Sequence, residues 1–327
     1  MTGRPHILFT ATFRSSFIEE DIRILQKDFF VSSVVASGWT TPFLFLQKIY
    51  NARLSYSWFA SVYSSLLVFL TKLLGKKSIL VLGGVDVAKE KTFSYGIWLN
   101  PWKSILIRYG LIHASAVIAV DNFLKLEAIR LARYNGDNIR VIPTGYDPEF
   151  WKHSGVKEPR VLMVASCPNE AHARLKGFDV LLRVARLLPS TQFEIIGVGP
   201  GVAAFFDIPA NVICAPFMPR EVLLRAYQKS KVYCQLSYRE GLPNSLCEAM
   251  LCECVPVGSN VGGIPTAIGN AGYLVNYNDE TQTAAAIRDA LASPPESGMN
   301  ARARIASQFN FRRREEALKK LVEELLT

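Results

Sequence analysis

The sequence has no Cys-x-x-Cys pair, no apolar run long enough to cross a bilayer, and no N-terminal stretch resembling a secretory signal. Its six cysteines lie between Cys167 and Cys254, mostly within apolar runs. This placement excludes a disulfide-stapled miniature and favours buried free thiols. The most apolar window, Trp58–Leu74, contains several serines and is too short and too polar to span a membrane. We therefore expect a cytoplasmic protein.

Acidic residues are scarce only in the first half of the chain. Lys and Arg total 37 against 28 Asp and Glu, a formal net charge of +9. Up to Lys157 there are 19 basic and 11 acidic residues, and beyond it 18 and 17. Because no basic stripe interleaved with aromatics and no nucleic-acid module is present, this excess favours an anionic substrate or a membrane surface over nucleic acid.

The pattern of apolar residues predicts an α/β protein. Half of the 327 residues are hydrophobic, enough for a substantial core. Short β-branched runs alternate with segments of helical period, a rhythm typical of parallel sheets covered on both faces. It runs through the chain twice, so we expect two doubly wound units. The expected strands are HILFTAT, FVSSVVAS, SILVLGG, AVIAVD and IRVIPTG, then RVLMVAS, FEIIGVG, NVICAPF, VYCQLS, VPVGSN and GYLV.

A polar stretch, Asp147–Pro159, separates the two rhythms and contains two prolines and a glycine. We place the domain boundary inside it, with residues 1–157 in the first domain and 158–305 in the second. Asn300–Leu326 reads as one long charged amphipathic helix. Ligands of doubly wound sheets bind beyond the carboxyl ends of the strands, so we expect a cleft between the domains, lined by the loops that follow the strands.

Two carboxylates, Glu240 and Glu248, lie eight residues apart in EGLPNSLCE, across a predicted turn from strand to helix. Asn244 is a favourable N-cap, and Pro243 fixes the chain entering the helix. A helix start presents unpaired amides to an anion, and carboxylates accept hydrogen bonds from vicinal hydroxyls. One acid could therefore hold a ribose, the other a transferred sugar, and the amides the linking diphosphate. Those amides belong to Ser245, Leu246 and Cys247.

This stretch resembles the E-x7-E signature of retaining glycosyltransferases of the GT-B fold, especially family 4 (glycosyl transferases group 1). Residues 255–275, VPVGSNVGGIPTAIGNAGYLV, resemble the stretch that follows the signature in that family. Lys176-Gly177 resembles its KG motif, whose lysine contacts the donor diphosphate, and GVGP at residues 197–200 also agrees. In the first half, residues 114–151 resemble the last strands and the interdomain join of the same enzymes.

The resemblance implies a retaining hexosyltransferase that moves a sugar from a UDP- or GDP-sugar to a glycan, lipid-linked or other hydroxyl acceptor. Two Rossmann-like domains would face each other, the first binding the acceptor and the second the donor. The helix of residues 306–327 would pack back on the first. Glu240 would hold the donor sugar, Glu248 the ribose, and Lys176 the leaving diphosphate. Further donor-side residues implied are Arg174, Gly199, Phe217, Asn244, Ser245 and Leu246.

No metal or other cofactor is expected. The sequence contains no Asp-x-Asp, which counts against a metal-dependent transferase of the other common fold. A GT-B enzyme needs no metal if amides and cations neutralise the leaving diphosphate. GVGPG is not Gly-x-Gly-x-x-Gly, so a nicotinamide dehydrogenase is poorly supported. A nucleotide-sugar epimerase, a sugar phosphorylase, and a non-catalytic sugar- or membrane-binding protein remain as alternatives.

The chain departs from the family pattern at several positions. Glu170 stands where many members have an arginine, so the nearest cation is Arg174. The loop after the first strand, ATFRSSF, lacks the usual glycines, so we expect the side chains of Thr12 and Arg14 to act on the acceptor side. Asp86 replaces the usual N-terminal histidine. It either joins the catalytic set by orienting a sugar or acceptor hydroxyl, or is an ordinary turn aspartate.

Aromatic residues crowd the segment 42–77. A core strand and helix explain most of it, yet the flanking basic residues also suit anionic lipid. These are Lys48, Arg53, Lys72, Lys76 and Lys77. The expected partners are thus a nucleotide-diphosphate sugar, a glycan or lipid-linked acceptor and an anionic membrane surface met by the N-terminal domain. The expected location is cytoplasmic, peripheral on the inner face of the membrane.

Overall fold

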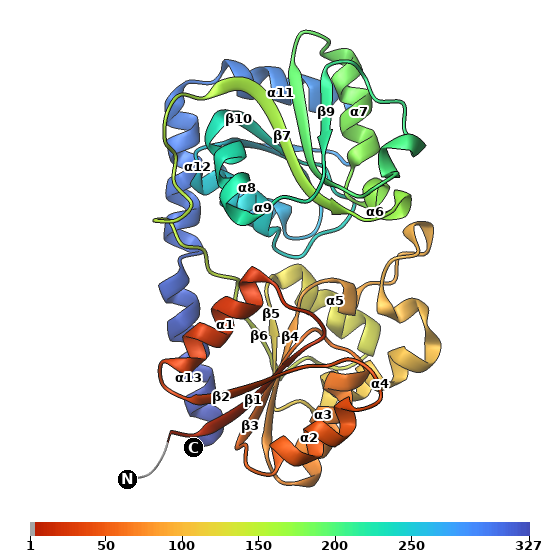
Figure 1. Ribbon diagram of the computed structural model, residues 1–327, viewed down its shortest axis with the longest axis vertical. Coiled ribbons are helices and arrows are strands. Elements are labelled where there is room, and N and C mark those ends of the chain that lie inside the picture. The colour runs from red at the N-terminus through yellow and green to blue at the C-terminus, as the bar shows by residue number, and fades with distance from the viewer. Residues whose placement is uncertain (1–3) are drawn as a thin grey trace. The chain divides into compact units, whose positions relative to one another are not determined.

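The computed structural model describes residues 4–327, which divide into two compact units (Figure 1). Unit 1 comprises the chain up to Gly145 together with Phe311–Thr327, and unit 2 comprises Tyr146–Asn310. The first boundary lies twelve residues before the predicted one at 157/158. The reason is Trp151, which is 1% exposed and packs edge-on against Tyr227 of unit 2 with ring centroids 5.6 Å apart. The polar stretch therefore folds with unit 2.

Unit 1 is built on a six-stranded parallel sheet in the order β2-β1-β3-β4-β5-β6. Its strands are β1 (His6–Ala11), β2 (Phe30–Val35), β3 (Leu54–Trp58), β4 (Lys77–Leu82), β5 (Ala116–Ala119) and β6 (Ile139–Val141). Four lie within the predicted segments, and β4 begins one residue before its predicted segment. The additional strand, β3, is LSYSW, in which every residue is buried. It lies in the aromatic segment 42–77, where a core strand was expected without stated bounds.

The helices of unit 1 cover both faces of this sheet (Figure 1). They are α1 (Ser16–Gln26), α2 (Thr41–Ile49), α3 (Val62–Leu73), α4 (Pro101–His113), α5 (Asn122–Ala132) and α13 (Phe311–Leu326), with 3-10 turns at Val85–Val87, Lys91–Phe93 and Ile97–Leu99. The last helix is fastened by Arg314, which is 4% exposed. Its guanidinium meets both oxygens of the fully buried Asp21 at 2.6 Å. The polar side of this helix therefore includes an arginine that is buried in unit 1.

Unit 2 repeats the plan with a second six-stranded parallel sheet in the order β12-β11-β10-β7-β8-β9. Its strands are β7 (Glu158–Cys167), β8 (Gln192–Val198), β9 (Val212–Ala215), β10 (Ser230–Gln235), β11 (Val255–Ser259) and β12 (Tyr273–Val275). The helices are α6 (Glu170–Leu175), α7 (Phe178–Leu187), α8 (Arg220–Lys229), α9 (Asn244–Leu251), α10 (Ile264–Ile268), α11 (Glu280–Ala292) and α12 (Pro295–Gln308), with a 3-10 turn at Val202–Phe205. The two doubly wound parallel sheets predicted from the sequence are confirmed.

The single helix predicted over Asn300–Leu326 is wrong. Helix α12 ends at Gln308 and α13 begins at Phe311. The amide of Tyr146 donates to the carbonyl of Phe309 at 2.9 Å. The Phe309 carbonyl therefore accepts from outside the helix, which helps to end α12. The break between the two helices coincides with the boundary between unit 2 and unit 1.

Both sheets have a point at which the strand order reverses. In unit 1, β2 and β3 lie on opposite sides of β1, so the order reverses at β1. In unit 2, β8 and β10 lie on opposite sides of β7, so the order reverses at β7. The loops that follow the strands diverge there, and ligands of such sheets bind in the crevice between them. The topology alone thus directs attention to the loops after β1 and β3, and after β7 and β10.

All six cysteines are free, five of them buried. No helix within residues 4–327 combines the length and the apolar character needed to cross a membrane.

Candidate active site

A cluster of polar side chains lies at the switch point of unit 2. Lys176 follows β7 through the short helix α6, and Glu240 follows β10. Their side chains form an ion pair, Nζ to Oε1, at 2.6 Å, with 23% and 13% of the side chains exposed. A charge pair so largely withdrawn from water is costly to desolvate and needs further hydrogen bonds around it.

Those hydrogen bonds come from the end of β10. The Ser237 hydroxyl and the Gln235 amide donate to the same Oε1 of Glu240, at 2.8 and 3.1 Å. Gln235 in turn accepts from the hydroxyls of Tyr233, at 3.2 Å, and Ser245, at 3.4 Å. The contacts from Lys176, Gln235 and Ser237 all fall on Oε1 of Glu240. The network orients the carboxylate before any ligand arrives.

Two glycines let these segments approach one another. Gly177 has φ +79°, and a Cβ there would lie 2.1 Å from the Leu236 carbonyl at the end of β10. Gly262 has φ +55°, and its Cβ would lie 2.2 Å from the carbonyl of Glu240. Both positions demand a left-handed backbone and close backbone contact, so only glycine fits. Gly177 of the KG motif and Gly262 of the stretch 255–275 therefore help to place Lys176 and Glu240.

Helix α9 begins beside this cluster, although its cap differs from the prediction. The N-cap is Pro243, and Asn244 is the first helical residue. The Asn244 side chain instead accepts from the hydroxyl of Tyr146 at 2.7 Å. The amide of Cys247 donates to the Pro243 carbonyl at 3.2 Å, so it is not among the amides open to an anion. The open first-turn amides are those of residues 244–246.

Glu248 lies one turn into α9, apart from the Lys176–Glu240 pair. Its carboxylate accepts from the hydroxyl of the buried Tyr227 at 3.2 Å. Burial of the carboxyl group raises the pKa of Glu248 to about 7, while Arg220 and the Tyr227 hydroxyl act in the opposite direction. Glu248 is therefore poised between its neutral and charged forms near neutral pH, unlike a surface glutamate.

Arg174 and Glu170 satisfy each other. They lie one turn apart on α6, and the guanidinium contacts the Glu170 carboxylate at 2.8 Å. Arg174 also lies 5.1 Å from the centre of the Phe206 ring. A role for Arg174 toward a diphosphate would require it to leave Glu170, the residue that stands in the usual arginine position.

Two further predicted donor-side residues lie on the loops after β8 and β9. The amide of Gly199 donates to the carbonyl of Cys167 at 2.9 Å, and a Cβ there would lie 2.9 Å from the same oxygen. Gly199 therefore acts by close packing against the end of β7. Phe217 is 79% exposed, a large apolar ring available to a ligand.

The predicted acceptor-side residues lie in unit 1, on the loop after β1. Thr12 is partly exposed. Arg14 is ion-paired with Glu19 at 2.8 Å and donates to Ser33 at 2.9 Å. Asp86 is only 1% exposed.

The contacts of Asp86 are those of a turn aspartate. Its carboxylate accepts from the amides of Gly83 and Gly84, the shortest at 2.7 Å, and from the amide of Ala60 at 3.0 Å. Burial raises the pKa of Asp86, and these amides oppose the rise. A substrate hydroxyl would have to displace backbone amides to reach it. The structure therefore favours the turn interpretation over a place in the catalytic set.

Sequence reasoning missed the side chains that support the site, namely Gln235, Ser237, Tyr146 and Tyr227. A signal for the first two was available. In VYCQLS, two polar residues two positions apart end an otherwise apolar strand, and such residues point to the same face. Tyr146 and Tyr227 are distant in sequence and left no local signal.

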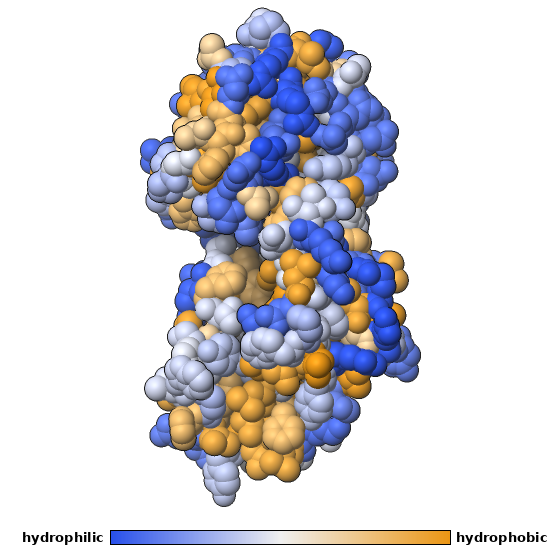
Figure 2. Space-filling view, turned by 90° about the vertical axis from the view of Figure 1, so that its right-hand side faces the viewer, coloured by the Kyte–Doolittle hydropathy of each residue, from blue (hydrophilic) through white to orange (hydrophobic). Residues whose placement is uncertain are grey.

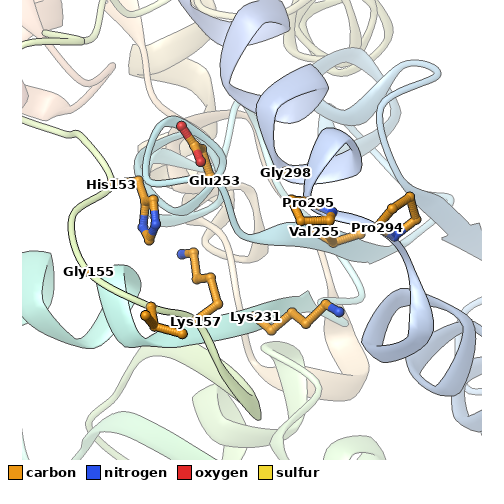
Figure 3. Close-up of a pocket in the computed structure, with 10 residues that line it drawn as sticks. His153, Gly155, Lys157, Lys231, Glu253, Val255, Pro294, Pro295 and Gly298 are labelled. Atoms are coloured by element: carbon orange, nitrogen blue, oxygen red, sulfur yellow. The ribbon is translucent and has the colours of Figure 1, made fainter.

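A pocket of about 350 Å³ also occurs in unit 2, at the amino ends of the strands of its sheet (Figure 3). Its lining includes Lys157, Lys231 and Val255, which precede or begin β7, β10 and β11. The Lys157 ammonium is committed to the carbonyls of Tyr227 and Cys252 at 2.7 and 2.6 Å. This lysine therefore stabilises the fold, and the switch-point cluster is the better candidate.

Comparisons with known proteins give a family match to unit 2. Residues 150–308 match the family of glycosyl transferases group 1. Over 167 residues the chain is 31% identical to a D-inositol 3-phosphate glycosyltransferase of Mycolicibacterium vanbaalenii, covering 44% of this chain and 37% of that protein. Over 202 residues it is 25% identical to the N-acetyl-alpha-D-glucosaminyl L-malate synthase of Bacillus anthracis, covering 57% and 52%. The chain thus spans about a third to a half of the length of these relatives.

Solved structures resemble the whole chain. Sucrose-phosphate synthase of Thermosynechococcus elongatus superposes with a TM-score of 0.79 at 15% identity, covering 98% of this chain and 99% of that one. Anabaena Alr3699/HepE, in complex with UDP, gives 0.77 at 15% identity, covering 98% and 100%. Likeness at this identity establishes the fold, and the predicted GT-B fold is confirmed.

Proposed function

We propose that this protein is a retaining, metal-independent glycosyltransferase of family 4 that transfers a sugar from a nucleotide-diphosphate sugar to a hydroxyl acceptor. The observation that carries the proposal is the Lys176–Glu240 pair at the switch point of unit 2, beside the open amides of α9. A cation, a helix start and an oriented carboxylate are what a sugar diphosphate requires. The family match over residues 150–308 favours transfer over the epimerase, phosphorylase and binding-protein alternatives.

The leaving diphosphate is the centre of the proposed mechanism. Lys176 and the amides of Ser245 and Leu246 would neutralise the charge that develops as the bond from the anomeric carbon to the phosphate oxygen breaks. Glu240 would accept from hydroxyls of the transferred sugar, and Glu248, when ionised, from the ribose. Donor binding would exchange the Lys176–Glu240 contact for contacts with phosphate and sugar. No metal enters this scheme.

Retention is proposed to follow from attack on the face that the diphosphate leaves. The acceptor oxygen bonds to the anomeric carbon, and its proton passes to the departing phosphate oxygen. No carboxylate is assigned as a covalent nucleophile. UDP-sugars are the first donors to test, since the similar Alr3699/HepE structures hold UDP and UDP-glucose. A GDP-sugar is the second choice.

The test is turnover of UDP-glucose with a panel of glycoside and lipid-linked acceptors, without added metal, and NMR of the anomeric configuration of the product. We expect acceptor-dependent release of UDP and an α-linked product from the α-linked donor. Inversion would contradict retention. Consumption of donor without acceptor would favour an epimerase, and dependence on phosphate a phosphorylase.

We further propose that unit 1 meets an anionic membrane from the cytoplasmic side through α2, α3 and α4. Between Phe29 and Val120 the sequence has nine Lys and Arg but only two acidic residues, one of them the buried Asp86. Apolar side chains gather on this unit in the lower part of Figure 2. Those exposed on or beside the three helices include Trp39, Phe43, Leu46, Tyr50, Phe69, Leu73, Trp102 and Ile105. Aromatic rings with basic neighbours suit an anionic lipid interface.

Vesicle co-sedimentation tests this membrane proposal. The protein should sediment with vesicles containing phosphatidylglycerol and not with pure phosphatidylcholine, and binding should weaken as salt is raised. Phe43→Asp, at a position 75% exposed on α2, should abolish sedimentation. Phe205→Asp, at a position 62% exposed in unit 2, is the matched control and should not. Equal binding by both variants would contradict the assignment of this face.

A further inference from the structure

The switch point of unit 1 has a different chemistry from that of unit 2. In unit 2 the loops after β7 and β10 bring together an ammonium and a carboxylate, Lys176 and Glu240. In unit 1 the corresponding loops, after β1 and β3, bring together aromatic rings, Phe13 and Phe59. Ligands of doubly wound sheets bind at this point. The crevice at the switch point of unit 1 therefore favours a ligand with an apolar surface.

Three rings form this surface, which we call the phenyl platform: Phe13, Phe17 and Phe59. The rings of Phe13 and Phe59 stack with centroids 5.0 Å apart and an interplanar angle of 29°. Phe17 stands edge-on to Phe59 at 6.3 Å and also contacts the buried Trp58 at 4.9 Å. Phe13 is 47% exposed, and the other two are partly exposed. The platform thus has a supported base and an open face.

The backbone is strained to present this platform. Phe59 has φ +67°, a left-handed conformation that is rare for a bulky residue and that tends to occur at functional sites. Its amide is held by the Val81 carbonyl at 2.9 Å, and the next amide, of Ala60, by Asp86 at 3.0 Å. A Cβ at Gly83 would lie 2.1 Å from the Phe59 ring. Asp86 and Gly83 therefore act as positioning residues for the ring.

One charged pair lies beside the platform. Arg14, one residue after Phe13, is paired with Glu19 at 2.8 Å, so this loop offers an anion little net attraction. The face of a phenyl ring is negative, and it attracts C–H groups polarised by neighbouring oxygens, as on the apolar face of a sugar ring. The side chain of Thr12 is partly exposed beside it and can bond a hydroxyl.

We infer that the phenyl platform of Phe13, Phe17 and Phe59 is a carbohydrate subsite, which stacks the apolar face of a neutral sugar ring. That it serves the acceptor rests on the proposed function; that it binds a sugar ring rests on unit 1 alone. The acceptor is accordingly a neutral glycoside or the terminal sugar of a glycan, rather than an anionic group.

Ligand-observed saturation-transfer NMR with methyl α-glucopyranoside and maltose tests the subsite without requiring turnover. Three variants are compared with the unaltered protein: Phe13→Ala, Phe13→Trp, and Phe205→Ala as a matched exposed phenylalanine in unit 2. Phe13→Ala should raise the apparent Kd of the glycosides about tenfold or more, equivalent to about 1.4 kcal/mol. Phe13→Trp should retain binding, and Phe205→Ala should not change it.

Three results would overturn the inference: no glycoside signal from the unaltered protein, equal binding by Phe13→Ala and Phe205→Ala, or displacement of the glycosides from the platform by uridine. Protection against thermal unfolding by UDP separates this inference from the proposed function. If UDP protects none of the proteins but Phe13→Ala still loses glycoside binding, the transferase proposal fails and the subsite stands. If UDP protects all of them and glycoside binding is insensitive to Phe13, the subsite fails alone.

Discussion

Lys176 and Glu240 depend on each other at the residue scale, and their separate removal should have large effects. Lys176→Ala removes the cation proposed for the leaving diphosphate and strands a carboxylate that is 13% exposed. Loss of one preorganised charge-stabilising group costs about 10²- to 10³-fold in kcat. We expect that loss for Lys176→Ala in steady-state turnover of the donor, and a similar loss for Glu240→Gln.

Arg174→Ala is the matched control for that measurement. Because Arg174 is 44% exposed and paired with Glu170, we expect kcat to change by no more than a few-fold. A loss as large as that of Lys176→Ala would show instead that Arg174 leaves Glu170 and contacts the diphosphate.

Glu248 gives a pH dependence whose sign follows from its pKa. Burial raises that pKa to about 7, whereas an unfolded glutamate titrates near about 4.3. Between these values the folded protein binds the extra proton, so this residue's contribution to the free energy of unfolding falls as pH rises from about 4.3 to 7. Glu248→Gln should flatten that slope in urea denaturation at a series of pH values. An unchanged slope would mean that Glu248 is ionised throughout.

At the scale of elements, the KG turn is the part of the site most sensitive to backbone change. Gly177→Ala combines a positive φ with a Cβ 2.1 Å from the Leu236 carbonyl. Gly201→Ala has a similar φ of +75° but open space around the Cβ, so it carries the conformational cost alone. We expect both variants to lower the free energy of unfolding, Gly177→Ala by about 1–3 kcal/mol more, and only Gly177→Ala to lower turnover. Equal effects would show that the close approach is not needed.

Comparison of the helices and strands with the sequence shows which parts of the site could be predicted. The sequence identified Lys176, Gly177 and Glu240, and it covered Gly262 within the stretch 255–275. Each lies in a short motif whose residue types few other sites require. The Glu170–Arg174 pair was readable from its spacing of four on one helix, and it was passed over. The stacking of Phe13 on Phe59 was not readable, because 46 residues separate them and the register of two parallel strands brings them together.

Unit 1 is completed at the whole-molecule scale by a helix from the far end of the sequence. Asp21 is fully buried and accepts from Arg314, from the hydroxyl of Tyr56 and from the indole of Trp58, the last two at 2.7 Å. Sequence patterns predicted the helix but not its partner, because a buried ion pair 293 residues apart follows only from the folded topology.

Arg314→Leu leaves the buried carboxylate of Asp21 without its cation, and we expect a loss of about 3–5 kcal/mol in the free energy of unfolding. Faster hydrogen exchange in residues 311–327 should accompany it. Lys319→Ala, on the same helix as Arg314, removes an exposed pair with Asp28 and should leave the free energy of unfolding nearly unchanged. Comparable losses from the two variants would contradict the role given to the Asp21 cluster.

We propose that the switch-point cluster of unit 2 binds a nucleotide diphosphate. Thermal unfolding of the protein with UDP, GDP and ADP, in the absence of metal, tests this binding. A ligand at 100 times its Kd adds about 2.7 kcal/mol to the free energy of unfolding. We expect one nucleotide, most directly UDP, to raise the Tm of the unaltered protein, and we expect neither Lys176→Ala nor Glu248→Ala to show that rise. A rise that survives both substitutions, or no rise with any nucleotide, would contradict the assignment of this cluster as the donor site.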